Sequence, residues 1–79
     1  MSHRVLITGS NGLLGQKLVK LLLSEGIEFL ATSFGLNRNV DCPDERYSPM
    51  DVTNVDDVES VIKTYKPTSI IHTAAMTNV

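Results

Sequence analysis

Residues 8–15 have the sequence Thr8-Gly9-Ser10-Asn11-Gly12-Leu13-Leu14-Gly15, between the apolar run Val5-Leu6-Ile7 and a segment with helical periodicity. A buried strand that ends in such a turn and continues into a helix leaves backbone N–H groups without partners. Those donors and the positive end of the helix dipole attract a pyrophosphate. Gly9 can adopt the dihedral angles of a tight turn, and the missing Cβ at Gly12 lets a phosphate approach the main chain. The stretch therefore predicts a dinucleotide-binding turn.

The composition is that of a small globular domain. The chain has 79 residues, of which 42% are hydrophobic, and its seven basic and nine acidic residues give a net charge of −2. At this length the core is small, so we expect one domain at most. The basic residues are scattered, which provides no electrostatic site for nucleic acid or an anionic membrane.

Cysteine usage and the amino-terminus bear on the compartment. Cys42 is the single cysteine and has no Cys or His neighbour at metal-ligand spacing, which favours a reducing cytoplasm and no bound metal. The chain begins without a secretory leader, and no apolar run approaches the length of a membrane span. We expect a cytoplasmic protein without a membrane partner.

The elements alternate between strand and helix. We expect strands at 4–8, 27–33, 46–50 and 68–74, a first helix over 12–24, and a second helix that follows residues 53–56, has Lys63 and Lys66 in its last turn and ends at Pro67. Leu14, Leu18, Leu21 and Leu22 share one face of the first helix, and a capping box at Thr53-Asn54-Val55-Asp56 precedes the second. The second helix has an apolar stripe formed by Val55, Val58, Val61, Ile62 and Tyr65. Right-handed crossovers then predict an α/β fold, the first half of a doubly wound Rossmann sheet with parallel strands in the order 3-2-1-4.

Three separated segments resemble the extended short-chain dehydrogenase/reductase superfamily. Residues 8–15 resemble its TGxxGxxG turn, Met50-Asp51-Val52-Thr53 resembles its adenine-contacting Asp segment, and Thr73-Ala74-Ala75 is similar to its fourth-strand alanine motif. Within the superfamily, residues 74–79 are similar to the A-A-x-T-x-V stretch of the dTDP-4-dehydrorhamnose reductases. The resemblance covers nearly the whole chain.

The resemblance implies a cofactor site and a role for each position. Backbone at Gly12, Leu13 and Leu14 would contact the pyrophosphate, and Asp51 would accept a hydrogen bond from the adenine amino group. The expected cofactor-binding residues are Gly9, Asn11, Gly12, Leu13, Leu14, Ser33, Arg38, Asp51, Val52, Ala74, Ala75 and Met76, with Thr77 near the substrate. Simpler interpretations remain open, because Asp51 can begin the turn before a capped helix and Ala74 and Ala75 can be small core residues.

The end of the second strand bears on the choice of cofactor. A site selective for NAD places an acid there to bind the ribose 2′-hydroxyl, whereas this chain has Ser33. Arg38 follows shortly and can pair with a 2′-phosphate, which favours NADP(H), with NAD(H) as the alternative. Arg38 can equally be an ordinary solvated loop residue.

No catalytic residue is predicted within these 79 residues. The resemblance implies a Tyr-x-x-x-Lys pair that supplies a proton, but Tyr47 is followed four residues later by Asp51 and Tyr65 by Ser69. His72 lies in the last strand and is interpreted as structural. Because that strand would also be left with an exposed edge, we expect the chain to be the amino-terminal part of a dinucleotide-binding domain whose remainder, with the substrate domain, lies elsewhere.

The functional hypothesis is the cofactor-binding portion of a reductase that transfers hydride to a nucleotide-linked 4-keto-6-deoxy sugar. One alternative is a non-catalytic dinucleotide-binding regulatory subunit similar to that of methionine adenosyltransferase. Another is a nucleotide-sugar epimerase or dehydratase of the same superfamily. The expected partners are the nucleotide sugar and, as an option left open, a second copy of the chain.

Overall fold

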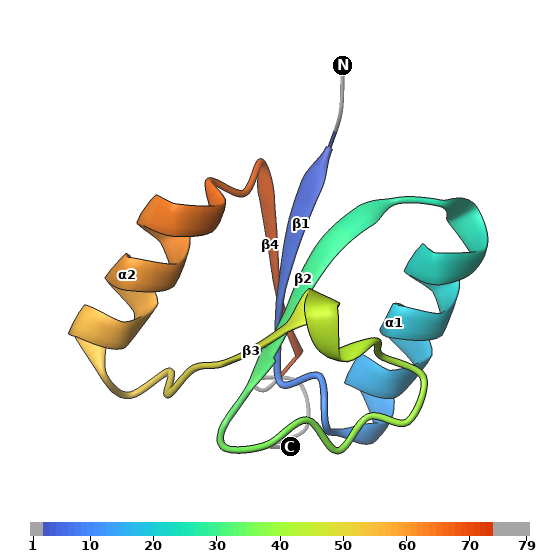
Figure 1. Ribbon diagram of the computed structural model, residues 1–79, viewed down its shortest axis with the longest axis horizontal. Helices are drawn as coiled ribbons and strands as arrows, with labels where there is room; N and C mark the ends of the chain where they lie inside the picture. Colours follow the sequence, from blue (N-terminus) through green and yellow to red (C-terminus); the bar gives the residue numbers. More distant parts are fainter. Residues whose placement is uncertain (1–2, 74–79) are drawn as a thin grey trace.

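The computed structural model describes residues 3–73, in which four strands form one parallel sheet between two helices (Figure 1). The strands are β1 (Arg4–Thr8), β2 (Glu28–Ser33), β3 (Tyr47–Pro49) and β4 (Ser69–His72). The helices are α1 (Leu13–Glu25) and α2 (Val55–Tyr65), and a 3₁₀ turn, η1 (Asp44–Arg46), precedes β3. The strand order is β3-β2-β1-β4. The predicted α/β architecture and strand order are confirmed.

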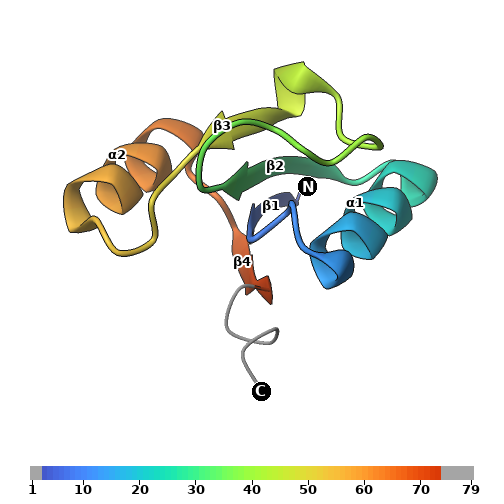
Figure 2. The same ribbon diagram turned by 90° about the horizontal axis from the view of Figure 1, so that it is seen from below.

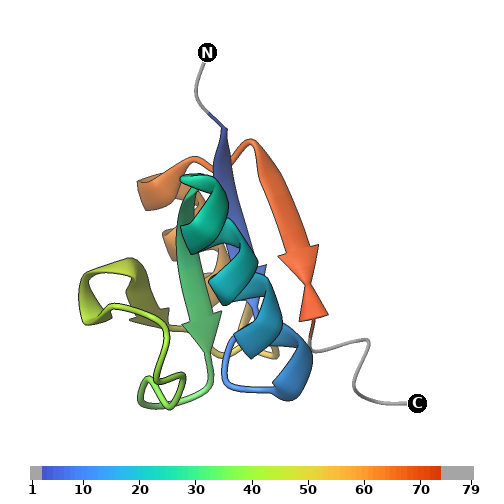
Figure 3. The ribbon, with the colours of Figure 1, turned by 90° about the vertical axis from the view of Figure 1, so that its right-hand side faces the viewer.

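The helices lie on opposite faces of the sheet, with α1 on one side and α2 on the other (Figures 1 and 2). Because the strands are parallel, their carboxyl ends share one edge, where the loops after β1 and β2 also lie (Figure 3). Ligands of doubly wound sheets bind at this edge, next to the strand at which the order reverses. Here that strand is β1.

The main core lies between the sheet and α1. Val5 pairs with Phe29 and Ile7 with Ala31 across β1 and β2, and these side chains pack with Val19 and Leu22 of α1 and with Cys42. Leu6 points to the other face and is 1% exposed. A central strand covered on both faces has to be apolar throughout, which explains the uninterrupted run at residues 5–7.

Helix α1 presents a different face to the sheet from the one its leucines indicate. Its buried residues are Gly15, Val19 and Leu22, whereas Leu14 and Leu21 are 41% and 55% exposed. The predicted Leu14/Leu18/Leu21/Leu22 face is therefore wrong at two positions. The physical cause is the close contact of Gly15 with the glycine turn, which fixes the rotation of the helix about its axis.

Helix α2 begins one residue later than the predicted capping box implies. Asn54 is the N-cap, and its Oδ1 accepts a hydrogen bond from Asp57 N–H at 3.2 Å. Thr53 lies one residue before the cap, and its hydroxyl donates to Asp51 Oδ1 at 2.6 Å. Val61 and Tyr65 of the apolar stripe line a cavity with Leu30 of β2. The stripe is only half-buried at Val58, Val61, Ile62 and Tyr65, and Val55 is exposed.

Residues 3–73 contain neither a membrane-spanning helix nor a cluster of metal-ligating side chains. None of the helices described there is long and apolar enough to cross a membrane. In the same part of the chain, no group of three or more His, Cys, Asp or Glu side chains could hold a metal ion.

Candidate functional site

The glycine turn joins β1 to α1 through a residue with a positive φ angle, Gly9. Gly9 has φ +80°, a conformation that side chains other than glycine rarely adopt. Gly12 N–H donates to Gly9 O at 3.1 Å and closes the turn, and Gln16 N–H then donates to Gly12 O at 2.9 Å as the first helical bond. The sequence from residue 8 to residue 15 thus folds as the predicted strand–turn–helix.

The first turn of α1 offers backbone donors to an anion. Gly12 is the N-cap and has no side chain to accept from them, and the first turn contains no acidic residue. The side chains of Leu13 and Leu14 are 79% and 41% exposed. The helix dipole and these N–H groups therefore act together at one position, as pyrophosphate binding requires.

A cavity of about 330 Å³ lies at the carboxyl ends of β1, β2 and β3. Its lining consists of Gly9, Ser33, Phe34, Met50, Asp51, Val52 and Thr53. Four of the predicted site residues, Gly9, Ser33, Asp51 and Val52, thus converge from three separate segments. Phe34, Met50 and Thr53 were not predicted as site residues. The walls are mainly apolar and include one carboxylate, which suits a flat ring bearing an N–H donor.

Asp51 begins the turn before α2, as the simpler interpretation anticipated. Its Oδ1 accepts from Thr53 N–H at 2.9 Å and from Thr53 Oγ1 at 2.6 Å, and its own N–H donates to Asp57 Oδ2 at 2.8 Å. Both side-chain bonds use Oδ1, so Oδ2 remains an acceptor. The hydrogen bond from the Thr53 hydroxyl, then that from the Thr53 N–H, lowers the pKa of Asp51 below its ordinary value of 3.8. The turn role and a ligand role are compatible.

We expect Thr53→Val to raise the pKa of Asp51 towards 3.8, because the variant keeps the shape of the side chain but loses the hydroxyl donor. A depressed carboxyl pKa adds stability that is present above about pH 3.8 and is lost as the pH falls through the folded-state pKa. NMR titration of the Asp51 carboxyl carbon measures the shift. Thr64→Val near the carboxyl end of α2 is the matched control and should leave the pKa of Asp51 unchanged. An unshifted pKa in Thr53→Val would contradict the assignment.

The loop between β2 and β3 covers the glycine turn. Asn11 Nδ2 donates to Leu36 O at 3.0 Å, and Asn11 Oδ1 accepts from Arg38 N–H at 2.7 Å. In return, Asn39 Nδ2 donates to Ser10 O at 2.9 Å. The predicted ligand Asn11 therefore binds the loop through both ends of its carboxamide.

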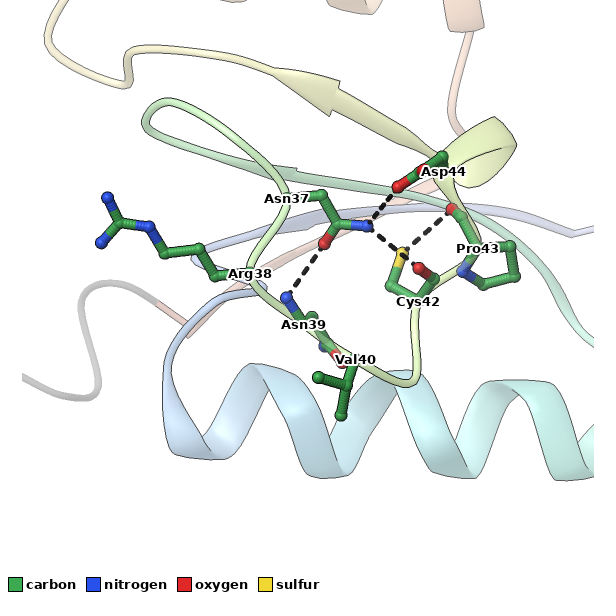
Figure 4. A pocket seen from close by; sticks show the side chains of 7 residues that line it. All are labelled: Asn37, Arg38, Asn39, Val40, Cys42, Pro43 and Asp44. Atoms are coloured by element: carbon green, nitrogen blue, oxygen red, sulfur yellow. Dashed lines mark hydrogen bonds between the residues drawn. The ribbon is translucent and has the colours of Figure 1, made fainter.

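Arg38 does not line the 330 Å³ cavity. It is exposed on the loop and borders a second cavity of about 420 Å³, and its side chain extends away from the other residues around that cavity (Figure 4). The remaining lining residues are Asn37, Asn39, Val40, Cys42, Pro43 and Asp44. Asn37 ties this part of the loop together by donating to Cys42 O at 3.0 Å and Asp44 Oδ1 at 3.1 Å.

Cys42 has a packing role in this loop. It is a free thiol, 6% exposed, and belongs to the core between the sheet and α1. Burial, with the nearby Asp44 carboxylate, raises the pKa of the thiol. A protonated, buried thiol is a poor nucleophile.

The two tyrosines also have structural contacts. Tyr47 OH lies 3.0 Å from Ser33 O and 2.7 Å from Gly35 O, to which it donates, and the Tyr65 ring lies 4.6 Å from the Arg4 guanidinium. Burial raises the pKa of both phenols, so each stays protonated. Tyr47 thereby anchors the start of the β2–β3 loop.

The end of β4 is tied to the glycine turn. Thr8 Oγ1 and His72 Nδ1 share a hydrogen bond, and Thr73 Oγ1 donates to Thr8 O and Gly9 O at 2.5 and 3.1 Å. The sequence predicted no such contacts for Asn39, Tyr47 or Thr73. Single polar residues give no periodic pattern from which their contacts could be inferred. The predicted Ala74, Ala75, Met76 and Thr77 lie outside the described residues.

Comparison with known proteins gives matches over the same region. Residues 3–79 match the family model described as RmlD substrate binding domain. A dTDP-4-dehydrorhamnose reductase from Aggregatibacter actinomycetemcomitans is 43% identical over 77 residues, which is 96% of this chain and 22% of that protein. The chain thus spans about a fifth of the length of this relative, and the resemblance indicated by the glycine turn is confirmed.

Solved structures support the same grouping. L-threonine dehydrogenase from Clostridium difficile superposes with a TM-score of 0.78 at 28% identity, over 90% of this chain and 23% of that one. UDP-glucose 4-epimerase from Thermus thermophilus, in complex with NAD, superposes with a TM-score of 0.76 at 27% identity, over 87% of this chain and 23% of that one. WbmG from Bordetella bronchiseptica, in complex with NAD and UDP, superposes with a TM-score of 0.75 at 32% identity, over 91% of this chain and 25% of that one.

Proposed function

Because this chain belongs to the RmlD substrate binding domain family, we propose that it is the amino-terminal, cofactor-binding part of a longer reductase. That reductase transfers hydride from a nicotinamide dinucleotide to a nucleotide-linked 4-keto-6-deoxy sugar. The observation that carries the proposal is the 330 Å³ cavity, into which the glycine turn, the end of β2 and the Asp51 segment converge. The 43% identical reductase supports the reaction, and its greater length supports the larger protein.

The described residues fit a dinucleotide along its length. The N-terminus of α1 would bind the pyrophosphate, and Asp51 Oδ2 would accept from the adenine amino group beside Val52. Ser33 would lie near the adenosine ribose. When bound, the nicotinamide group supplies the hydride; this part of the chain binds and orients the cofactor, and the proton donor belongs to the remainder of the protein.

We propose NADP(H) as the preferred cofactor. Ser33 stands where an acid would repel a 2′-phosphate, and Arg38 provides a guanidinium on the adjacent loop. Two of the structural relatives are complexes with NAD, so NAD(H) is the alternative. A buried, free Cys42 fits the reducing cytoplasm, where we place the protein.

The direct test uses the full-length protein, verified by intact mass, with NADPH and a dTDP-linked 4-keto-6-deoxy sugar. We expect NADPH oxidation in step with formation of the 4-hydroxy sugar. Cofactor binding without turnover would favour a regulatory subunit instead. Retained NAD with isomerised sugar and no net cofactor consumption would favour an epimerase, and either result overturns the proposal.

A further inference from the structure

Two asparagines join the β2–β3 loop to the glycine turn in opposite directions; we call this pair, Asn11 and Asn39, the asparagine clamp. Asn11 projects from the turn and binds the loop at Leu36 O and Arg38 N–H. Asn39 projects from the loop and binds the turn at Ser10 O. Arg38 is thus held through its own backbone N–H and lies next to Asn39 in the chain.

Further hydrogen bonds and burial hold the asparagine clamp in one conformation. Asn39 is 2% exposed, its Oδ1 accepts from Asp41 N–H at 3.0 Å, and its own N–H donates to Asn37 Oδ1 at 3.0 Å. Ser10, its partner in the turn, is fully buried, and Ser10 N–H donates to Thr32 O at 3.0 Å. The backbone on both sides of the contact is therefore fixed, because buried amides that lose such partners are costly.

We propose that Asn11 and Asn39 are positioning residues that set the preference for a 2′-phosphorylated adenosine by holding Arg38 beside the glycine turn. The inference rests on the proposed dinucleotide function. A loop already ordered before the ligand arrives loses less conformational freedom on binding, so the guanidinium–phosphate contact contributes more to affinity. In this account Asn11 acts through the loop and is not a ligand of the pyrophosphate.

The two possible roles of Asn11 have different signatures. NADH and NADPH share the pyrophosphate, so loss of a pyrophosphate ligand weakens both cofactors alike. Loss of a residue that positions Arg38 weakens NADPH selectively, because the 2′-phosphate alone distinguishes the two cofactors. The NADPH-to-NADH affinity ratio therefore separates positioning from direct contact and from general destabilisation.

The experiment measures Kd for NADPH and NADH with the full-length protein and its Asn11→Ala, Asn39→Ala, Arg38→Ala and Asn11→Ala/Arg38→Ala variants. Asn11→Ala and Asn39→Ala should each weaken NADPH about tenfold, as loss of a charge-assisted contact would, and NADH less than about threefold. In the Arg38→Ala background, Asn11→Ala should no longer affect the two cofactors differently. If the buried Asn39→Ala variant does not fold, half-buried Asn11 decides the test.

Gln16→Ala is the matched control. Gln16 Nε2 donates to Asn11 O at 3.0 Å, so this variant removes a side-chain bond to the same residue without touching the loop. It should leave the NADPH-to-NADH ratio unchanged. Equal weakening of both cofactors by Asn11→Ala, or a selective effect that persists without Arg38, would overturn the inference. Failure of the wild-type protein to bind either cofactor would instead refute the proposed function.

Discussion

Gly15→Ala is expected to destabilise the protein by about 3 kcal/mol, at the upper end of the cost of overpacking a close contact. A Cβ at this position would lie 2.4 Å from Gly9 O and 2.6 Å from Ser10 Cα. Both neighbours are backbone atoms of the glycine turn, so a side-chain rotation cannot relieve the clash. The helix or the turn has to move, and the donors of α1 move with it. Alanine's better helix propensity offsets only about 1 kcal/mol.

Thermal unfolding of the full-length variant and its Kd for NADPH measure the two consequences, and both should worsen. Gly26→Ala is the control, because Gly26 caps the other end of the same helix at φ +67° with no atom within 4 Å of an added Cβ. It should cost about 1–2 kcal/mol, the penalty of the left-handed conformation, and leave NADPH affinity unchanged. A Gly15→Ala variant as stable as wild type, with normal affinity, would show that the turn is not packed as described.

The topology was predictable because local patterns fix it. An apolar run buried on both faces, followed by a glycine turn and a helix, specifies β1 and its neighbours, and handedness then gives the strand order. The rotation of α1 was not predictable from its leucines. It depends on a contact between Gly15 and a backbone carbonyl at Gly9, and hydrophobic periodicity contains no information about such a contact.

The residues of the candidate site likewise divide into those that the sequence could predict and those that it could not. Gly9, Ser33 and Asp51 were predictable because each ends or follows a parallel strand, and those ends meet at one edge. The clamp residues Asn11 and Asn39 needed the path of the β2–β3 loop, which has no regular pattern. The role of Arg38 at the cofactor stays a prediction, and the hydrogen bond that holds its backbone to Asn11 could not be predicted from the sequence.

The second large effect is expected for Arg38→Ala, which should weaken NADPH binding by tenfold or more while changing NADH binding little. A charge-assisted hydrogen bond contributes about 1.5–3 kcal/mol, and each 1.4 kcal/mol is a factor of ten in Kd. Arg38 is exposed, so solvent screening places the expected loss at the lower end of that range. Titrations of the full-length wild type and the variant with both cofactors give the NADPH-to-NADH affinity ratio of each protein.

Lys17→Ala on the exposed side of α1 is the matched control for Arg38→Ala, because it removes one positive charge without touching the loop. It should leave the NADPH-to-NADH affinity ratio within about twofold of wild type, since the charge of an exposed lysine is largely screened. Salt provides an independent check. In the wild type the ratio should fall as ionic strength rises, because the guanidinium–phosphate attraction is screened, whereas in Arg38→Ala that dependence should disappear. Equal loss of both cofactors in Arg38→Ala would mean that Arg38 does not contact the 2′-phosphate, and any preference for NADP(H) would have to arise elsewhere in the protein.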